Sequence, residues 1–220
     1  MRYAKFVAAS LGLTALFTAA IPLLNLITDP LDVFRVVKAE GFNRIKSNYI
    51  SYSRLAKPSQ VERGNYSKLA IGSSRVLMGM PMTGTAWNDD PTQAFNMGLN
   101  GANLRVSREL FEHAIATTDV KEVVMTVDFF MFNAWNASGA YDQPLATLNE
   151  TSKQRFIRER DTLMGLLFSP GVTTASLETL RRQREKYDKQ LADGGTNPAH
   201  EIRQALRDGY EVRFQQFEDR

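Results

Sequence analysis

Apolar residues form one uninterrupted run near the N-terminus, FVAASLGLTALFTAAIPLLNLI at residues 6–27, which contains no charged side chain. At helical rise this run covers about 33 Å, enough to cross a hydrocarbon core of about 30 Å. Residues 1–28 are therefore predicted to form a membrane anchor, with residues 6–27 in the lipid bilayer. A cleaved signal peptide is the alternative, but its apolar region is usually about 7–15 residues long, so the length favours an uncleaved anchor.

The two positive charges that precede this run predict its orientation. Arg2 and Lys5 lie on its N-terminal side, and basic residues stay on the cytoplasmic side of a membrane. We therefore expect a single-pass protein of the bacterial inner membrane, with the remaining chain in the periplasm or otherwise outside the cytoplasm.

The apolar pattern changes beyond the anchor. Residues 29–67 carry mixed charges and are expected to be a juxtamembrane connector, interrupted by Lys57-Pro58. Three short apolar runs then predict strands, and apolar positions at helical spacing predict a helix between the second and the third. The third strand is almost continuously apolar, which is typical of a strand covered on both faces, as in a parallel sheet. The predicted strands are KLAIG at 68–72, AFNMG at 94–98 and EVVMTVDFF at 122–130, and the helix covers 102–117.

This order of elements predicts an α/β domain over residues 68–133. An open parallel sheet normally has four or five strands, so a domain with three is expected to be incomplete, and a truncated fragment of a longer protein is the favoured explanation. Residues 134–220 are expected to be a charged helical extension or insertion, with helices near 151–168 and 172–191. Ser169 is the predicted N-cap of the second, with Pro170 at its first position.

Composition excludes several classes of protein. The 43% hydrophobic and 23% charged residues are typical of a globular chain, and the net charge of +3 is spread among mixed signs, so we expect no nucleic-acid partner. The chain has no cysteine, which rules out disulfides and thiolate chemistry. No metal or cofactor is expected. The two histidines are His113 and His200.

Polar and glycine residues follow the first two predicted strands. Gly72-Ser73-Ser74-Arg75 follows the first, and FNMGLNGAN at 95–103 ends the second just before a helix, where backbone N–H groups can face an anion. Strand ends of an open α/β sheet share one crevice. An ordinary turn, in which the serines bond their own backbone, is the alternative.

Together these motifs resemble the SGNH, or GDSL-like, hydrolase superfamily, over residues 66 to about 133 and in a membrane-anchored bacterial branch. The resemblance implies a flavodoxin-like three-layer parallel sheet, Ser74 as nucleophile and the Gly101 N–H in the oxyanion hole. Ser73 stands where the family has aspartate. The third block of the family, Gly-x-Asn-Asp, is replaced by residues 127–133, so its oxyanion asparagine is missing. The remaining candidates for substrate binding are Arg75, Asn100, Asn103 and Asp128.

The catalytic base of that family lies in an Asp-x-x-His block, which this chain lacks. His200 has Asn197 three residues before it, and His113 is expected to be a solvated or helix-face residue. A serine without a positioned base is a poor nucleophile. Asp128 either orients a substrate hydroxyl or bonds nearby backbone N–H groups, and Arg75 either binds an anionic group or is structural. Basic residues of 153–189 are expected on solvated helix faces, whereas packing is expected for Phe129, Phe130, Phe132 and Trp135.

The resulting hypothesis is a serine acyl-ester hydrolase or O-acyltransferase that acts outside the cytoplasm, on envelope polysaccharide or an acylated small substrate. A non-catalytic envelope scaffold or binding protein with a degenerate SGNH-like fold is the alternative, and the fragment hypothesis stays open beside both.

Overall fold

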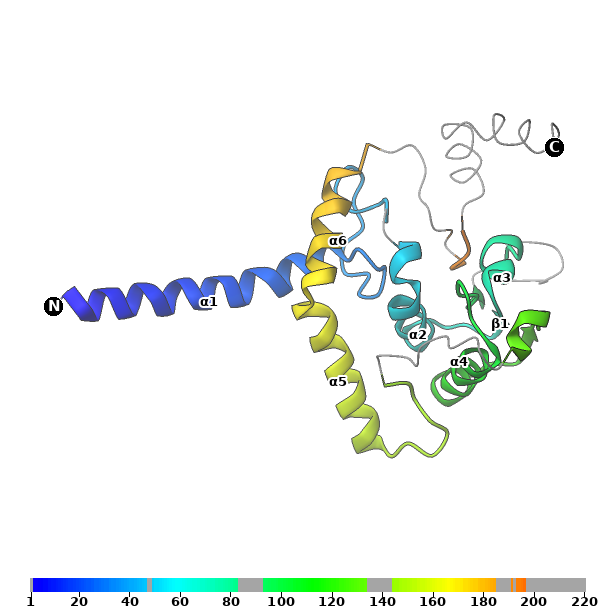
Figure 1. Ribbon diagram of the computed structural model, residues 1–220. Coiled ribbons are helices and arrows are strands. Elements are labelled where there is room, and N and C mark those ends of the chain that lie inside the picture. Colours follow the sequence, from blue (N-terminus) through cyan, green and yellow to red (C-terminus); the bar gives the residue numbers. More distant parts are fainter. Residues whose placement is uncertain are drawn as a thin grey trace.

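The computed structural model describes residues 2–46, 49–82, 93–133, 144–184, 191 and 193–196. A long helix, α1 (Arg2–Thr28), projects from an α/β domain (Figure 1). It is long and apolar enough to cross a membrane, and none of its most apolar stretch is buried by the rest of the chain. The further elements are η1 (Tyr49–Tyr52), α2 (Ser53–Arg63), β1 (Lys68–Ile71), α3 (Ser74–Gly79), β2 (Ala94–Asn96), α4 (Leu104–Thr117), β3 (Glu122–Met125), η4 (Phe129–Phe132), α5 (Ser152–Phe168) and α6 (Pro170–Arg181).

The three strands form one parallel sheet in the order β2-β1-β3, which confirms the predicted α/β class. Leu69 in the central strand lies opposite Phe95 of β2 and Val123 of β3. All three carboxyl ends therefore meet at one edge of the sheet. Trp135, His200 and the polypeptide beyond Thr196 lie outside the described residues.

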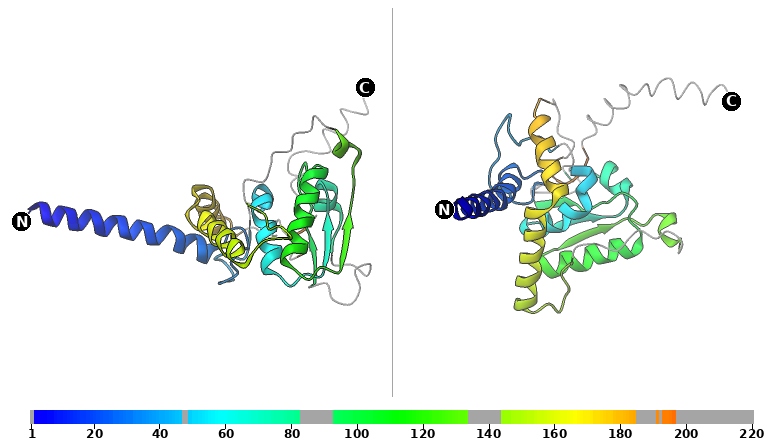
Figure 2. Two further views of the ribbon diagram at one scale, coloured as in Figure 1. Left: turned by 90° about the horizontal axis from the view of Figure 1, so that it is seen from below. Right: turned by 60° about the vertical axis from the view of Figure 1, so that its left-hand side comes forward.

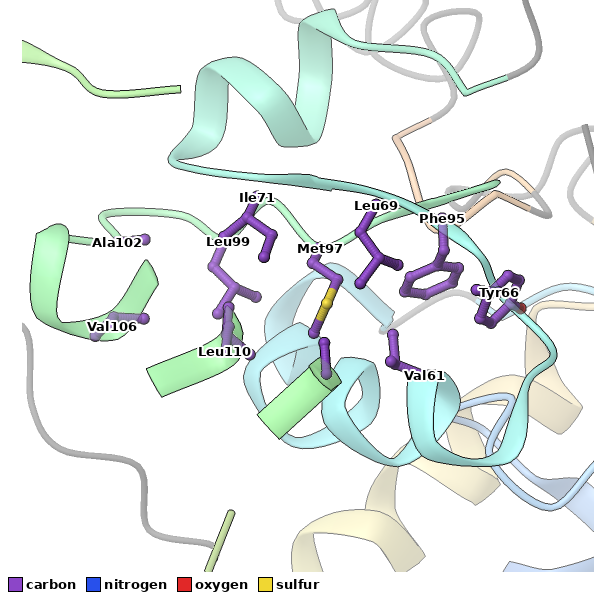
Figure 3. Close-up of a cluster of buried hydrophobic side chains, with 11 residues drawn as sticks. Val61, Tyr66, Leu69, Ile71, Phe95, Met97, Leu99, Ala102, Val106 and Leu110 are labelled. Atoms are coloured by element: carbon purple, nitrogen blue, oxygen red, sulfur yellow. The ribbon is translucent and has the colours of Figure 1, made fainter. Parts of the chain in front are cut away.

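Helices cover the two faces of the sheet unequally. Leu69 and Ile71 of β1 and Phe95 of β2 pack against α2 and α4 in the largest buried cluster (Figure 3). On the opposite face, Ala70 and Ala94 pack against Val76 of α3. Burial of large aliphatic and aromatic side chains contributes roughly 1.5–3 kcal/mol each, so the face under α2 and α4 holds most of the core.

The third strand is shorter and more exposed than the sequence predicts. It ends at Met125, and residues 129–132 form η4 instead of continuing it. Within the described residues β3 pairs with β1 alone. The side chain of Val124 lies on the same face as Ala70, and it is 40% exposed because α3 does not extend over β3. The expectation of cover on both faces is wrong for this reason. Packing of the aromatics was also a wrong expectation for Phe129 and Phe132, which are 94% and 69% exposed, and Phe130 is partly exposed.

A helix occupies part of the predicted connector. α2 continues through Pro58, so the break expected at Lys57-Pro58 is absent. Apolar periodicity does not reveal α2, because polar side chains fill its buried face. Gln60, for example, accepts a hydrogen bond from the Tyr49 hydroxyl (2.9 Å) and donates to the Leu31 carbonyl (2.8 Å). Such bonds offset the cost of burying polar groups.

The last turn of α1 is part of the domain. Asn25 is fully buried, and its amide nitrogen donates to the Leu167 carbonyl (2.8 Å) and to the Thr173 hydroxyl (3.0 Å). Its amide oxygen accepts from Ser176 (2.9 Å). The part of α1 that is free to cross a membrane therefore ends before Asn25, although the uncharged run continues to residue 27.

Helices α5 and α6 begin as the sequence predicts. Thr151 and Gln154 form a capping box at the start of α5, and Ser169 caps α6 with Pro170 at its first position. The basic residues of α5 are not all solvated, however. Arg158 is 6% exposed and binds Glu62 of α2 through both carboxylate oxygens (2.7 and 2.8 Å), and its Nε binds Glu150 (2.9 Å). The ion pair thus docks α5 on α2.

Removal of the Arg158 guanidinium should loosen this docking. Arg158→Met leaves the Glu62 and Glu150 carboxylates largely buried without a cation, so we expect a loss of about 3–5 kcal/mol in the free energy of unfolding. Arg155→Met is the matched control, because its pair with Glu159 lies near the surface on the same helix, and should cost less than about 1 kcal/mol. Denaturant unfolding of the full chain in detergent micelles measures both. Equal losses would contradict the assignment.

Candidate functional site

The serine pair lies at the carboxyl end of β1, where α3 begins. Ser73 has an extended backbone and caps α3, since its hydroxyl accepts from the Arg75 N–H (3.2 Å). Ser74 is the first helical residue, and it is half-buried. Its hydroxyl has no hydrogen-bond partner among the residues that the structure describes, so Ser73 is structural here and Ser74 is available.

Asp128 joins the end of β3 to the end of β1. It is buried, and its carboxylate accepts hydrogen bonds from the Ser73 hydroxyl and from Nη1 of Arg75 (2.5 Å). Asp128 thus binds two side chains of the serine turn, rather than the local backbone N–H groups considered above. The guanidinium of Arg75 stays largely exposed beside Ser74, because only one edge of it meets the carboxylate.

The loop after β2 runs alongside the serine turn. Leu99 N–H donates to the Gly72 carbonyl (3.0 Å), and a side chain at Gly98 would place its Cβ 2.4 Å from the backbone nitrogen of Leu77 in α3. Only glycine permits this approach. The two loops are thereby held side by side at the carboxyl edge of the sheet.

The remaining predicted residues lie further along this loop. Gly101 has a positive φ of 65° and is exposed, and Asn100 is exposed beside it. Asn103 caps α4, because its side chain accepts from the Val106 N–H. The structure thus brings Ser74, Arg75 and Asp128 into one cluster, with Asn100, Gly101 and Asn103 on the adjoining loop.

Sequence reasoning missed a buried polar network under this edge. Lys57 of α2 is fully buried, and its ammonium donates to the carbonyls of Asn96 (2.6 Å) and Gly98 (2.7 Å) and to the Asn96 side-chain oxygen (3.4 Å). The Asn96 amide in turn donates to the Val76 and Met80 carbonyls of α3. The sequence held one signal of this network, because Asn96 belongs to the asparagine-glycine motif at 95–103. No pattern in the sequence of α2 indicated that Lys57 is its partner.

The environment of Lys57 is unusual for a lysine. Burial lowers the pKa of its ammonium well below the ordinary value, and the nearby Asp193 carboxylate opposes that shift. Three acceptor oxygens nevertheless match the three N–H donors of an ammonium. Lys57 is sealed from solvent, so its role is to hold the strand end rather than to transfer a proton to a substrate.

His113 lies on a face of α4 and is buried, so of the two expected positions only the solvated one is wrong. Its Nδ1 accepts from the Ala146 N–H (3.0 Å), so Nε2 carries the proton and donates to the Pro58 carbonyl (3.1 Å). Burial lowers the pKa of the imidazole, which keeps it neutral. With both nitrogens occupied, His113 ties α4 to α2 and is not the base for Ser74.

The cluster has the parts of an acyl-transfer site except the base. It offers an accessible hydroxyl, a neighbouring cation and a loop of backbone N–H groups. No group of residues suited to a metal ion occurs in the described part of the chain. A polar cleft of about 160 Å³ lies elsewhere, between α2 and α5, and is lined by none of these residues.

Comparison with protein-family models, with curated proteins and with solved structures finds no match to this chain. The geometry defines the class on its own: an α/β protein with a parallel β2-β1-β3 sheet, a serine turn at its carboxyl edge and an apolar N-terminal helix.

Loss of the Lys57 ammonium should weaken the domain. Lys57→Met conserves most of the volume but leaves the Asn96 and Gly98 carbonyls without this donor, so we expect a loss of about 1–3 kcal/mol in the free energy of unfolding. Lys68→Met is the control, because Lys68 pairs with the exposed Glu122, and should cost less than about 1 kcal/mol. If Lys57→Met proves as stable as the natural chain, the desolvation cost outweighs these bonds and the proposed role is wrong.

Proposed function

We propose that this chain is a membrane-anchored, SGNH-type serine acyl-ester hydrolase or O-acyltransferase that acts outside the cytoplasm. The observation that carries the proposal is the position of Ser74, a half-buried residue at the carboxyl edge of a parallel sheet. Arg75 lies next to it and the glycine loop after β2 runs alongside.

The sheet order supports this class of fold. The order β2-β1-β3 is that of the first three strands of a flavodoxin-like sheet, 2-1-3-4-5, in which sites lie at the carboxyl ends of the strands. In the proposed site Gly101 contributes its N–H to the oxyanion hole, and Arg75 binds an anionic part of the substrate. Asn100, Asn103 and Asp128 shape the rim.

The location of the site favours a substrate in the aqueous phase. α3, which begins with Ser74, lies on the side of the domain opposite α1 (Figure 1). A membrane spanned by α1 is therefore remote from the serine, so a lipid in that bilayer cannot reach it easily. Acyl esters on an envelope polysaccharide suit this position. In the proposed reaction Ser74 carries the acyl group as an ester between the donor and the acceptor.

The base for Ser74 is proposed to come from outside the described residues, because His113 is occupied. Without a base, residual catalysis by such a site is roughly 10³–10⁴ above the reaction in water. Added imidazole or hydroxide can replace a missing proton acceptor. Reactivity of Ser74 should therefore rise with imidazole concentration and with pH.

The nucleophile is tested by labelling the full chain in detergent micelles with a fluorophosphonate probe. We expect slow labelling at neutral pH that increases with imidazole and vanishes in Ser74→Ala. Ser152→Ala is the matched control, since Ser152 is likewise the first residue of a helix, and it should label as the natural chain does. Labelling that survives Ser74→Ala, or none with imidazole, would contradict the proposed nucleophile.

A non-catalytic binding protein is the second candidate. One observation favours it. Both carboxylate oxygens of Asp128 and both ring nitrogens of His113 form hydrogen bonds within the domain, so neither side chain is available for catalysis. Absence of labelling together with an intact fold would support it.

The orientation is a separate prediction. Arg2 and Lys5 should keep the N-terminus in the cytoplasm, so alkaline phosphatase fused after Arg220 should be active in a bacterial host. The replacement of both residues by glutamate should reduce that activity. A fusion that is inactive, with a cytoplasmic reporter active at the same position, would reverse the assignment.

A further inference from the structure

Helices α5 and α6 lie across the C-terminal end of α1. Figures 1 and 2 show them between the projecting length of α1 and the remainder of the domain, with α2 and the sheet on the far side. Arg158 and Leu166 of α5 face α2 and the buried cluster around Tyr49. The opposite face of α5 is therefore turned in the direction in which α1 projects.

The height of α5 along α1 is fixed by hydrogen bonds. Asn25 binds the Leu167 carbonyl and the Thr173 hydroxyl, which places the junction of α5 and α6 level with residue 25. Residues 3–22 of α1 suffice for a hydrocarbon core of about 30 Å, so Asn25 lies about 5 Å beyond it. A helix with its side chains has a radius of about 5–6 Å, so the outer face of α5 reaches the boundary of the core at the end where α5 meets α6.

That outer face carries the side chains found at a bilayer surface. Phe156 is 66% exposed, Met164 is 52% exposed, and Ile157 and Phe168 are also exposed. Lys153 and Arg160 lie among them by helical spacing, and both are exposed. Long basic side chains can extend to the headgroups while aromatic and aliphatic ones enter the acyl boundary.

We propose that the outer face of α5 lies flat in the headgroup layer of the same bilayer that α1 spans. This face is defined by Lys153, Phe156, Ile157, Arg160, Met164 and Phe168. Lipid is thus the partner of this face, because α1 and the Asn25 bonds place α5 at the level of the headgroups. The inference rests on the membrane anchoring proposed above.

Contact with the membrane through both α1 and α5 would restrain the orientation of the domain more than α1 alone. α1 alone permits the domain to tilt relative to the membrane, whereas a contact along α5 restrains that tilt. The carboxyl edge of the sheet, with Ser74, would then be held at a constant distance from the surface and directed away from it.

The absence of cysteine makes the test direct. Single substitutions Phe156→Cys, Met164→Cys, Leu13→Cys and Phe129→Cys are each labelled with a nitroxide, in the full chain reconstituted into vesicles of phosphatidylethanolamine and phosphatidylglycerol. Collision of the label with oxygen, which concentrates in lipid, is compared with collision with a water-soluble nickel chelate. Leu13 is the control in α1, and Phe129, at the carboxyl edge of the sheet, is the matched exposed aromatic in the domain.

We expect the labels at positions 156 and 164 to collide with nickel less often than the label at position 129 does. Their depths should be similar to each other and should lie between those of positions 13 and 129. Water-exposed labels at 156 and 164, with position 13 in the hydrocarbon core, would overturn the α5 proposal and leave the anchor intact. A water-exposed label at position 13 would overturn both. Fluorophosphonate labelling of Ser74 in the same vesicles tests the serine site independently of either result.

Discussion

A buried ammonium group holds together the edge of the sheet on which the candidate site depends. Lys57 reaches from α2 to the carbonyls at the end of β2, and Asn96 continues the network into α3. Those bonds fix the turn that carries Ser74 relative to the loop that carries Gly101. A buried lysine is costly unless its donors are used, and the three acceptor oxygens around Lys57 offset that cost where α2, β2 and the following loop meet.

The two adjacent serines have different tasks because of this construction. The hydroxyl of Ser73 is used twice, once to cap α3 and once to bind Asp128. Ser74, one residue further, begins the helix and keeps its hydroxyl free of partners among the described residues. A helix start thus gives neighbouring residues of the same type different surroundings, one bonded within the domain and one without a hydrogen-bond partner among the described residues.

The C-terminal end of α1 is bonded into the domain rather than joined to it by a linker. Asn25 is a polar residue in an apolar helix, and it is satisfied by three bonds to α5 and α6. The same bonds set the direction of the domain relative to α1. α3 lies on the side of the domain opposite α1, so the serine edge is directed away from the projecting helix (Figure 1).

The sequence by itself determined the apolar helix, the three strands, the α/β class and the caps of α5 and α6, because each depends on a local pattern of apolar and capping residues. It also marked the serine turn and the glycine loop as neighbours. Only the tertiary structure decided that α2 is a core helix, that His113 and Arg158 are buried, and that β3 is half exposed. Those outcomes depend on partners distant in the chain: carbonyls, carboxylates and a missing neighbour for β3 among the described residues, none of which leaves a periodic signal in the residues themselves.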